Sequence, residues 1–141
     1  MPITNASSAE VRQIFATART VAVVGLSDKP DRDSYHAAAY LQQQGLKIIP
    51  INPNVAEVLG EKAYANLLDI REPVDIVDIF RKPEVVPGIV EEAIAIGAKA
   101  VWMQKGIVHN AAAEKARQAG LNVVMSKCIM IEHQSLQLSK P

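Results

Sequence analysis

Residues 20–35 read TVAVVGLSDKPDRDSY, and this stretch indicates the class of fold. Five small or β-branched residues lead to Gly25, a polar loop follows, and Ser34 opens a helical stretch that begins at Tyr35. The pattern predicts a buried parallel strand that runs into the N-terminus of a helix, with Ser34 as the helix cap. Because open α/β sheets bind ligands beyond the carboxyl ends of their strands, the loop of residues 25–34 is the expected functional site.

The rest of the sequence continues to alternate apolar strands with amphipathic helices. Further strands are expected at residues 47–51, 75–80, 100–103 and 122–125, and helices at residues 34–44, 84–96, 110–119 and 129–138, with a short helical turn near residues 64–68. Strands that alternate with helices at this spacing predict parallel βαβ units. The expected fold class is therefore α/β, with a doubly wound sheet of five parallel strands and helices on both faces.

A capping-box sequence, Ser7-Ser8-Ala9-Glu10, precedes the first strand and predicts a short N-terminal helix. Residues 1–19 are expected to cover one face of the sheet in this way. The length of 141 residues suits one domain, so residues 1–141 are expected to form a single unit.

The composition argues against several classes of binding partner. The chain carries 15 basic and 15 acidic residues, so no net charge attracts it to nucleic acid or to an anionic membrane. A single cysteine, Cys128, excludes an internal disulfide framework, and no spacing of histidine or cysteine resembles a metal site. The first residues show no basic segment followed by an apolar run, and no stretch approaches the ~18 apolar residues of a membrane span. We therefore expect a cytoplasmic protein without metal, nucleic-acid or membrane partners.

Groups suited to a nucleotide follow several of the expected strands. The first loop leads into a helix N-terminus, whose free N–H groups and dipole favour phosphate. This loop contains Gly25, Ser27, Lys29 and Arg32, and the later strands end in Asn52-Pro53, Phe80-Arg81-Lys82 and Gln104-Lys105-Gly106. Surface loops of any domain carry lysine and arginine, but here several cations converge on one rim of the sheet.

Two common nucleotide signatures are absent from the sequence. The first loop has only one glycine of the G-x-G-x-x-G pattern, and no acidic residue ends the second strand to bind the ribose hydroxyls of NAD. The sequence also lacks a G-x-x-x-x-G-K-[ST] loop, which argues against a P-loop ATPase. A different ligand with phosphate and adenine groups is therefore favoured.

Several ordered motifs follow one another from about Thr20 to Leu136. They are Ala22-Val23-Val24-Gly25-Leu26-Ser27 with Lys29-Pro30, Arg32 and Ser34-Tyr35, then Ile51-Asn52-Pro53, Phe80-Arg81, residues 91–99, Val101-Trp102-Met103-Gln104 with Gly106-Ile107, and residues 119–125 with Cys128. In these motifs the sequence resembles the small stand-alone coenzyme A (CoA) binding proteins, which are similar to the N-terminal domain of the succinyl-CoA synthetase alpha subunit. The resemblance implies a Rossmann-like fold with CoA or an acyl-CoA lying across the strand ends.

The resemblance also implies where CoA would bind. Gly25, Ser27 and Lys29 would contact the phosphates, Asn52-Pro53 the adenosine, and Met103-Gln104 with Gly106 would form the far wall. The complete set of expected CoA-binding residues is Gly25, Ser27, Lys29, Arg32, Ser34, Tyr35, Asn52, Pro53, Phe80, Arg81, Lys82, Met103, Gln104 and Gly106.

The sequence departs from its relatives at two positions in this pattern. Asp33 stands where many relatives have proline, and Ser126-Lys127-Cys128 stands where they carry an acidic-basic-cysteine run. The phosphorylated histidine of the synthetase lies in a second domain that is not expected in this chain, so ligase activity is not expected to carry over. The expected function is that of a non-catalytic CoA-binding module. An unidentified protein partner is also possible.

Two other functions remain open from the residues alone. One is an enzyme that uses Cys128 or His109 on an acyl thioester, although a buried Cys128 and a helix-capping His109 are the simpler interpretations. The other is an NAD-type nucleotide-binding fragment. Asp75 and Asp78 are expected on opposite sides of a strand, so they cannot act as a carboxylate pair, and Asp78 is expected to bond a neighbouring loop.

Overall fold

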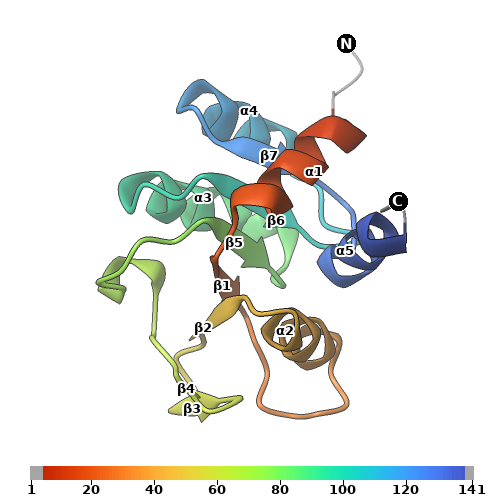
Figure 1. Ribbon diagram of the computed structural model, residues 1–141. Helices are drawn as coiled ribbons and strands as arrows, with labels where there is room; N and C mark the ends of the chain where they lie inside the picture. The colour runs from red at the N-terminus through yellow and green to blue at the C-terminus, as the bar shows by residue number, and fades with distance from the viewer. Residues whose placement is uncertain (1–4, 139–141) are drawn as a thin grey trace.

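The fold is built around a five-stranded parallel sheet (Figure 1). The structure is a computed structural model that describes residues 5–138; the first four residues, on which part of the cytoplasmic prediction rests, lie outside the described residues. The strands are β1 Thr20–Val24, β2 Lys47–Ile51, β5 Ile76–Ile79, β6 Ala100–Met103 and β7 Asn122–Val124, in the spatial order β2-β1-β5-β6-β7. Each neighbouring pair is parallel, which confirms the expected α/β, Rossmann-like fold class.

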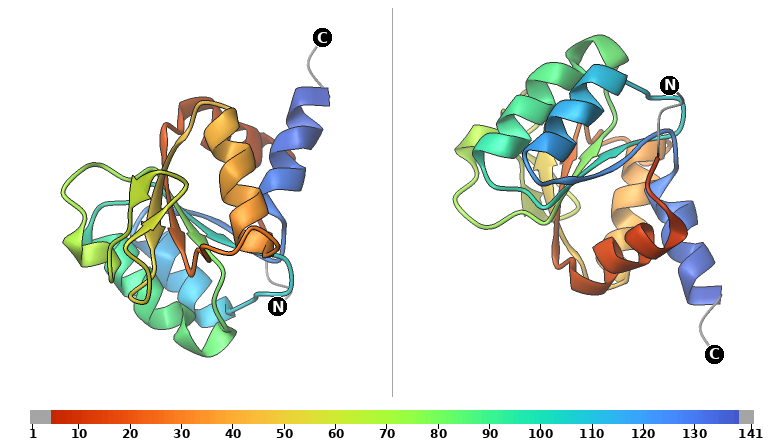
Figure 2. Two further views of the ribbon diagram at one scale, coloured as in Figure 1. Left: turned by 90° about the horizontal axis from the view of Figure 1, so that it is seen from below. Right: turned by 90° about the horizontal axis from the view of Figure 1, so that it is seen from above.

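Helices cover both faces of this sheet, as Figure 2 shows from two sides. They are α1 Ser8–Thr17, α2 Asp33–Gln43, α3 Val86–Ala95, α4 Asn110–Gln118 and α5 Ile129–Leu138. The helices α1, α2 and α5 pack on the face that carries Val21 and Val23, whereas α3 and α4 pack on the face that carries Ala22 and Val24. Successive side chains of a strand point to opposite sides, so the apolar run of β1 supplies both cores. No helix within residues 5–138 is long and apolar enough to span a membrane.

The N-terminal helix α1 carries the expected capping box. The Ser7 hydroxyl accepts the Glu10 N–H at 3.1 Å, and a Glu10 carboxylate oxygen accepts the Ser7 N–H at 3.2 Å. A side-chain cap of this kind contributes about 1 kcal/mol to a helix. Val11 and Ile14 of the same helix are buried in the core that α2 and α5 share.

The segment between β2 and β5 differs most from the sequence-based expectation. It contains a small antiparallel hairpin, β3 Glu57–Val58 with β4 Glu61–Lys62, which the sequence pattern did not predict. The helical turn expected near residues 64–68 is a 3₁₀ turn, η1, at Leu67–Asp69. Two-residue strands are too short to show period-two alternation, so this hairpin leaves no pattern in the sequence. The helix expected at residues 84–96 is also divided, into a 3₁₀ turn, η2 Pro83–Val85, and α3.

Asp78 lies in the middle of the sheet. The expectation that its side chain forms a hydrogen bond with a neighbouring loop is wrong. Asp78 lies in register between Val23 of β1 and Trp102 of β6, with 0% of its surface exposed. Neither carboxylate oxygen has a hydrogen-bond partner within the described part of the chain. Burial raises the pKa of the Asp78 carboxyl well above its ordinary range, which favours the neutral acid.

Candidate functional site

A cavity of about 730 Å³ opens at the carboxyl ends of β5 and β6, between α2 and α5. The residues that line this large cavity are Asp33 and His36 of α2, Phe80, Arg81 and Lys82 after β5, Gln104, Lys105 and Ile107 after β6, and Cys128, Met130 and Ile131 around the start of α5. Small-molecule sites in proteins commonly enclose about 300–1,000 Å³. The large cavity therefore has the size and the position of a ligand site in an open α/β sheet.

A second, small cavity of about 220 Å³ lies on the other side of the β1 end, between the end of β2, η1 and α3. Its walls are mixed, with apolar Val24, Ile51 and Ile89 beside polar Asn66 and Glu92. Arg81 lines both cavities. A ligand that extended from the small cavity into the large one would therefore contact the Arg81 side chain.

Gly25 ends β1 at a point where the backbone is crowded by protein. Its φ is +87°, and a Cβ atom added there would lie 2.6 Å from the Phe80 carbonyl oxygen and 3.0 Å from the Arg81 Cδ atom. The Gly25 N–H donates to the Ile51 carbonyl at 2.8 Å, which ties the ends of β1 and β2 together. Glycine is required here by the left-handed conformation and by the neighbouring end of β5.

The loop after Gly25 is held by two serines. The Ser27 N–H donates to the Ser34 hydroxyl at 3.1 Å, and the Ser27 hydroxyl accepts the Lys29 N–H at the same distance. Ser34 is therefore not the helix cap that the sequence predicts: α2 starts at Asp33, and its N-cap residue, Arg32, makes no side-chain capping bond. The helix begins two residues earlier than expected, so Ser34 lies inside its first turn and its hydroxyl bonds the preceding loop.

The N-terminus of α2 offers free donors as a result. The backbone N–H groups of Asp33, Ser34 and Tyr35 have no acceptor within residues 5–138. Uncapped N–H groups and the helix dipole together favour an anion such as phosphate. Lys29 and Arg32 lie in the same loop, together with the carboxylates of Asp28, Asp31 and Asp33.

The structure brings several of the expected CoA-binding residues together. Phe80, Arg81, Lys82 and Gln104 line the large cavity, and Pro53 joins Arg81 at the small one. Gly25, Ser27, Lys29, Arg32 and Ser34 form or flank the loop at the N-terminus of α2. Tyr35 is half-buried and packs against the core beneath α2, so its side chain belongs to the packing rather than to either cavity wall.

Three other expected residues have structural roles in this fold. Met103 is 0% exposed and packs in the core under α3 and α4, so its side chain cannot form the far wall. The Asn52 amide is engaged, donating to the Leu26 carbonyl at 3.0 Å and accepting the Asn54 N–H at 2.9 Å. Gly106 donates its N–H to the Ser126 hydroxyl at 3.1 Å and lies outside both cavities.

Sequence reasoning missed part of the large cavity. His36, Met130 and Ile131 line it, although none was expected at the site. Met130 and Ile131 belong to the first turn of α5, which follows the carboxyl end of β7. Ligands bind at the carboxyl ends of parallel strands, and the start of α5 lies just beyond the end of β7. The same rule could therefore have identified Met130 and Ile131 from the sequence.

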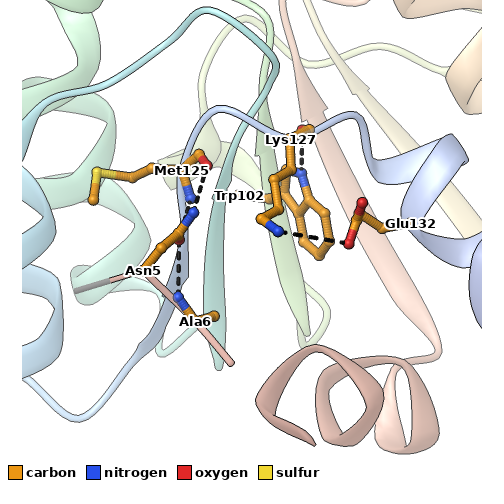
Figure 3. Close-up of polar contacts among 6 residues, drawn as sticks. All are labelled: Asn5, Ala6, Trp102, Met125, Lys127 and Glu132. Carbon is orange, nitrogen blue, oxygen red and sulfur yellow. Dashed lines mark hydrogen bonds and ion pairs between the residues drawn. The ribbon is translucent and has the colours of Figure 1, made fainter. Parts of the chain in front are cut away.

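The segment between β7 and α5 is fixed by polar contacts on both sides (Figure 3). The Asn5 side chain donates to the Met125 carbonyl at 2.8 Å and accepts the Met125 N–H at 2.9 Å. The indole N–H of Trp102, expected as a core residue, donates to the Lys127 carbonyl at 2.8 Å. These contacts place Cys128 at the wall of the large cavity.

The structure separates the two residues proposed for catalysis. His109 caps α4, because its Nδ1 atom accepts the Ala112 N–H at 3.1 Å, and it lines neither cavity. Cys128 lines the large cavity and is half-buried. The Lys127 ammonium, which adjoins Cys128 in the sequence, lies 4.0 Å from a carboxylate oxygen of Glu132 (Figure 3). That contact directs the neighbouring cation toward α5.

Unpaired cations lie in the loops that follow β1, β5 and β6. Lys29, Arg32, Arg81, Lys82 and Lys105 form no ion pair with another described residue. The site thus combines a small cavity with apolar residues in its wall, a helix N-terminus with free donors, a large cavity and several available cations. This combination suits a long ligand with an apolar ring, phosphate groups and a flexible arm.

Residues 19–134 match the family described as CoA binding domain. The chain belongs to this family. The match covers the whole parallel sheet, both cavities and the loop at the N-terminus of α2. It confirms the resemblance to small CoA-binding proteins that the strand-end motifs indicate.

Individual relatives agree with the family assignment. The chain is 41% identical to the uncharacterized protein YneT of Bacillus subtilis, over 92% of this chain and 96% of that protein. It is similar to a hypothetical protein of Pyrococcus horikoshii OT3 with a TM-score of 0.91 and 39% identity, over 97% of this chain and 96% of that one. It is also 28% identical to the ADP-forming acetate–CoA ligase of Methanocaldococcus jannaschii, over 86% of this chain but only 18% of the ligase.

Proposed function

We propose that this CoA-binding domain holds CoA or an acyl-CoA across both cavities and acts as a non-catalytic module. The observation that carries the proposal is that Arg81 lines both the small cavity and the large one, while Asp33, the first residue of α2, lines the large one. Free N–H groups and unpaired cations suit the diphosphate and the 3′-phosphate of CoA. The residues present therefore fit this ligand.

The order of the strands suggests how the ligand would lie. The small cavity, next to Pro53 at the β2 end, suits the adenine ring through the apolar residues in its wall. The diphosphate would lie at the N-terminus of α2, close to Arg32. The pantetheine arm would then cross the ends of β5 and β6 inside the large cavity, toward Cys128.

A binding role accounts for the site better than catalysis. His109 is used as a helix cap, and the carboxyl group of Asp78 is enclosed in the sheet and lines neither cavity. A module of this kind would present its CoA to a partner protein in the cytoplasm, and the identity of that partner is open.

The direct test is native mass spectrometry of the purified protein. The proposal expects a bound mass of CoA or of an acyl-CoA, lost on unfolding. A protein that carries no such mass and takes up none from added CoA would contradict it.

Cys128 at the wall of the large cavity supports a second candidate, an acyl carrier. In that reaction the Cys128 thiolate would attack the acyl thioester, the acyl group would move to Cys128, and CoA would leave as its thiolate. Intact-mass measurement after incubation with acetyl-CoA distinguishes the two functions. Retention of an acetyl group after denaturation, lost in Cys128→Ser, would favour the carrier.

Replacing Arg32 with alanine is expected to weaken CoA binding strongly. A charge-assisted contact with phosphate contributes about 1.5–3 kcal/mol, or roughly ten- to a hundredfold in affinity. The matched control is Arg12→Ala, because Arg12 lies on α1 and lines neither cavity. Calorimetric titration of both variants with CoA measures the difference, and equal losses would rule out the phosphate assignment of the loop.

Replacing Asp33 with asparagine is expected to strengthen CoA binding. Asp33 is exposed, starts α2 and lines the large cavity beside the proposed phosphate site. Removal of a like charge at a helix N-terminus should gain about 0.5–1 kcal/mol, or roughly two- to fivefold in affinity. Titration at two salt concentrations checks the prediction, since the gain should shrink at high salt. Unchanged affinity at low salt would place the phosphates away from Asp33.

A further inference from the structure

Part of the wall of the large cavity is apolar and comes from the segment after β6 and from the start of α5. We call it the acyl end and define it by Ile107, Cys128, Met130 and Ile131. Ile131 is 53% exposed, one of four large apolar side chains that are exposed among the described residues. Met130 and Ile107 are half-buried at the edges of the two cores. The acyl end therefore presents apolar surface to an open cavity.

Core packing does not explain why Ile131 is apolar. Ile129, at the start of α5, is 0% exposed, and His133 is 9% exposed. Buried positions four residues apart lie on the same face of a helix, and this face of α5 packs toward the sheet. Ile131 lies between these positions, on a different side of the helix. Its side chain contributes wall to the cavity instead of filling the core.

The sheet order indicates which part of the ligand would reach the acyl end. The proposed diphosphate site is at β1, whereas the acyl end follows β6 and β7. The end of β1 is two or three strand spacings, about 10–14 Å, from the ends of β6 and β7. A pantetheine arm that starts at the α2 N-terminus therefore brings its sulfur, and any group attached to it, toward Cys128 and Ile131.

Gln104 supplies a polar anchor before the acyl end. Its side chain is 5% exposed, and its Oε1 atom accepts the Ile129 N–H at 3.1 Å, which fixes the carboxamide. The Nε2 group has no acceptor among residues 5–138, and Gln104 lines the large cavity. A fixed amide donor in this wall suits a carbonyl oxygen of the pantetheine arm or of a thioester.

Resting on the proposed CoA-binding function, we infer that the acyl end binds an aliphatic acyl chain longer than acetyl. Such a chain would cover Ile131 and pack against Met130, whose unbranched side chain adapts to different chain lengths. Lys82 and Lys105 also line the cavity, and their methylene stems can extend along the chain while the ammonium groups stay in water. The physiological ligand is thus a short- to medium-chain acyl-CoA with an uncharged tail.

Calorimetric titration with CoA and with acetyl-, butyryl- and hexanoyl-CoA tests the inference. Burial of each added methylene should tighten binding by up to about fourfold, so the affinity should rise along the series. Equal affinities for acetyl- and hexanoyl-CoA would overturn the inference and leave the proposed function intact. If CoA itself and all three esters fail to bind, both the proposed function and the inference fall.

Succinyl-CoA provides a matched probe, because it has the length of butyryl-CoA and a terminal carboxylate in place of the methyl group. The inference expects succinyl-CoA to bind more weakly than butyryl-CoA, since the carboxylate would lose water at an apolar wall. Tighter binding of succinyl-CoA would overturn it and show that Lys82 or Lys105 selects a charged acyl group.

Paired variants locate the effect. Ile131→Ser should flatten the increase in affinity from acetyl- to hexanoyl-CoA. Leu68→Ser is the control, because Leu68 is 57% exposed, belongs to η1 and lines neither cavity. It should keep the increase. If the affinity of Ile131→Ser still increases from acetyl- to hexanoyl-CoA, the acyl chain does not bind at α5, and the assignment is contradicted.

Discussion

Replacing Gly25 with valine is expected to destabilise the whole domain. The added Cβ would lie 2.6 Å from the Phe80 carbonyl oxygen, a backbone atom that can move only if β5 moves. Valine is also disfavoured at a φ of +87°. Strain of about 1–2 kcal/mol from the left-handed backbone and about 1–3 kcal/mol from the clash should lower the free energy of unfolding.

The matched control for this variant is Gly120→Val. Gly120 has a φ of +92°, but nothing lies within 4 Å of the position of an added Cβ, so only the conformational cost applies. Urea unfolding of both variants should therefore show the larger loss for Gly25→Val. Equal losses would mean that the contact with the end of β5 is relieved without cost.

The sequence alone leads to a different expectation for Gly25→Val. Gly25 belongs to no apolar stripe, which predicts a folded variant that only fails to bind CoA. The structure favours destabilisation instead, because the Phe80 carbonyl crowds this position and is a main-chain atom 55 positions away that no side-chain pattern reveals.

Replacing Asp78 with asparagine is expected to remove a pH dependence from the stability of the domain. Burial raises the pKa of the folded Asp78 carboxyl, whereas the unfolded carboxyl titrates near pH 3.9. The neutral acid therefore gives its full stability below pH ~3.9, and this stability is lost as the pH rises toward the folded pKa. Over that interval one carboxyl should lower the free energy of unfolding by about 1.4 kcal/mol per pH unit.

The measurement is the difference between wild type and Asp78→Asn in urea unfolding from pH 4 to pH 8. Asparagine has the shape of the neutral acid and no charge to bury, so the difference should move in favour of the variant as the pH rises. Asp75→Asn is the control, because Asp75 accepts the N–H groups of Arg19 and Thr20 at 2.7 and 3.0 Å. It should lose stability but keep the wild-type slope that Asp78 causes. A pH-independent difference for Asp78→Asn would show that water or another group solvates the carboxyl.

The parallel sheet could be predicted from the sequence because its strands are short and mostly apolar. β1 and β6 have every residue from Val21 to Val24 and from Ala100 to Met103 buried, so their composition alone marks them. The same burial explains why the Met103 side chain was expected in the wall of the site although it lies in the core. An apolar residue at a strand end can face either the core or the rim of the sheet, and the sequence does not distinguish the two. The pairing of β3 with β4, by contrast, depends on contacts that short strands do not encode.

The candidate site could be predicted in outline because the carboxyl ends of parallel strands share one edge. That rule placed Arg81 and Gln104 at the large cavity. It did not show that the Asn52 amide bonds the Leu26 carbonyl, or that Ser34 bonds the preceding loop, because small polar side chains choose among nearby backbone partners. Ile131 was missed because an exposed apolar residue on a terminal helix resembles ordinary surface until the cavity beside it is seen.

Calorimetric titration of the purified, ligand-stripped protein with CoA and with NAD tests the central proposal most directly. Both ligands contain adenosine and a diphosphate, but only CoA adds a 3′-phosphate and a pantetheine arm that could use Arg81 and the large cavity. We expect CoA to bind at one site per chain and NAD to bind at least about a hundredfold more weakly, a difference of about 2.7 kcal/mol. Equal affinities for the two ligands would contradict the proposal that the two cavities form a CoA site.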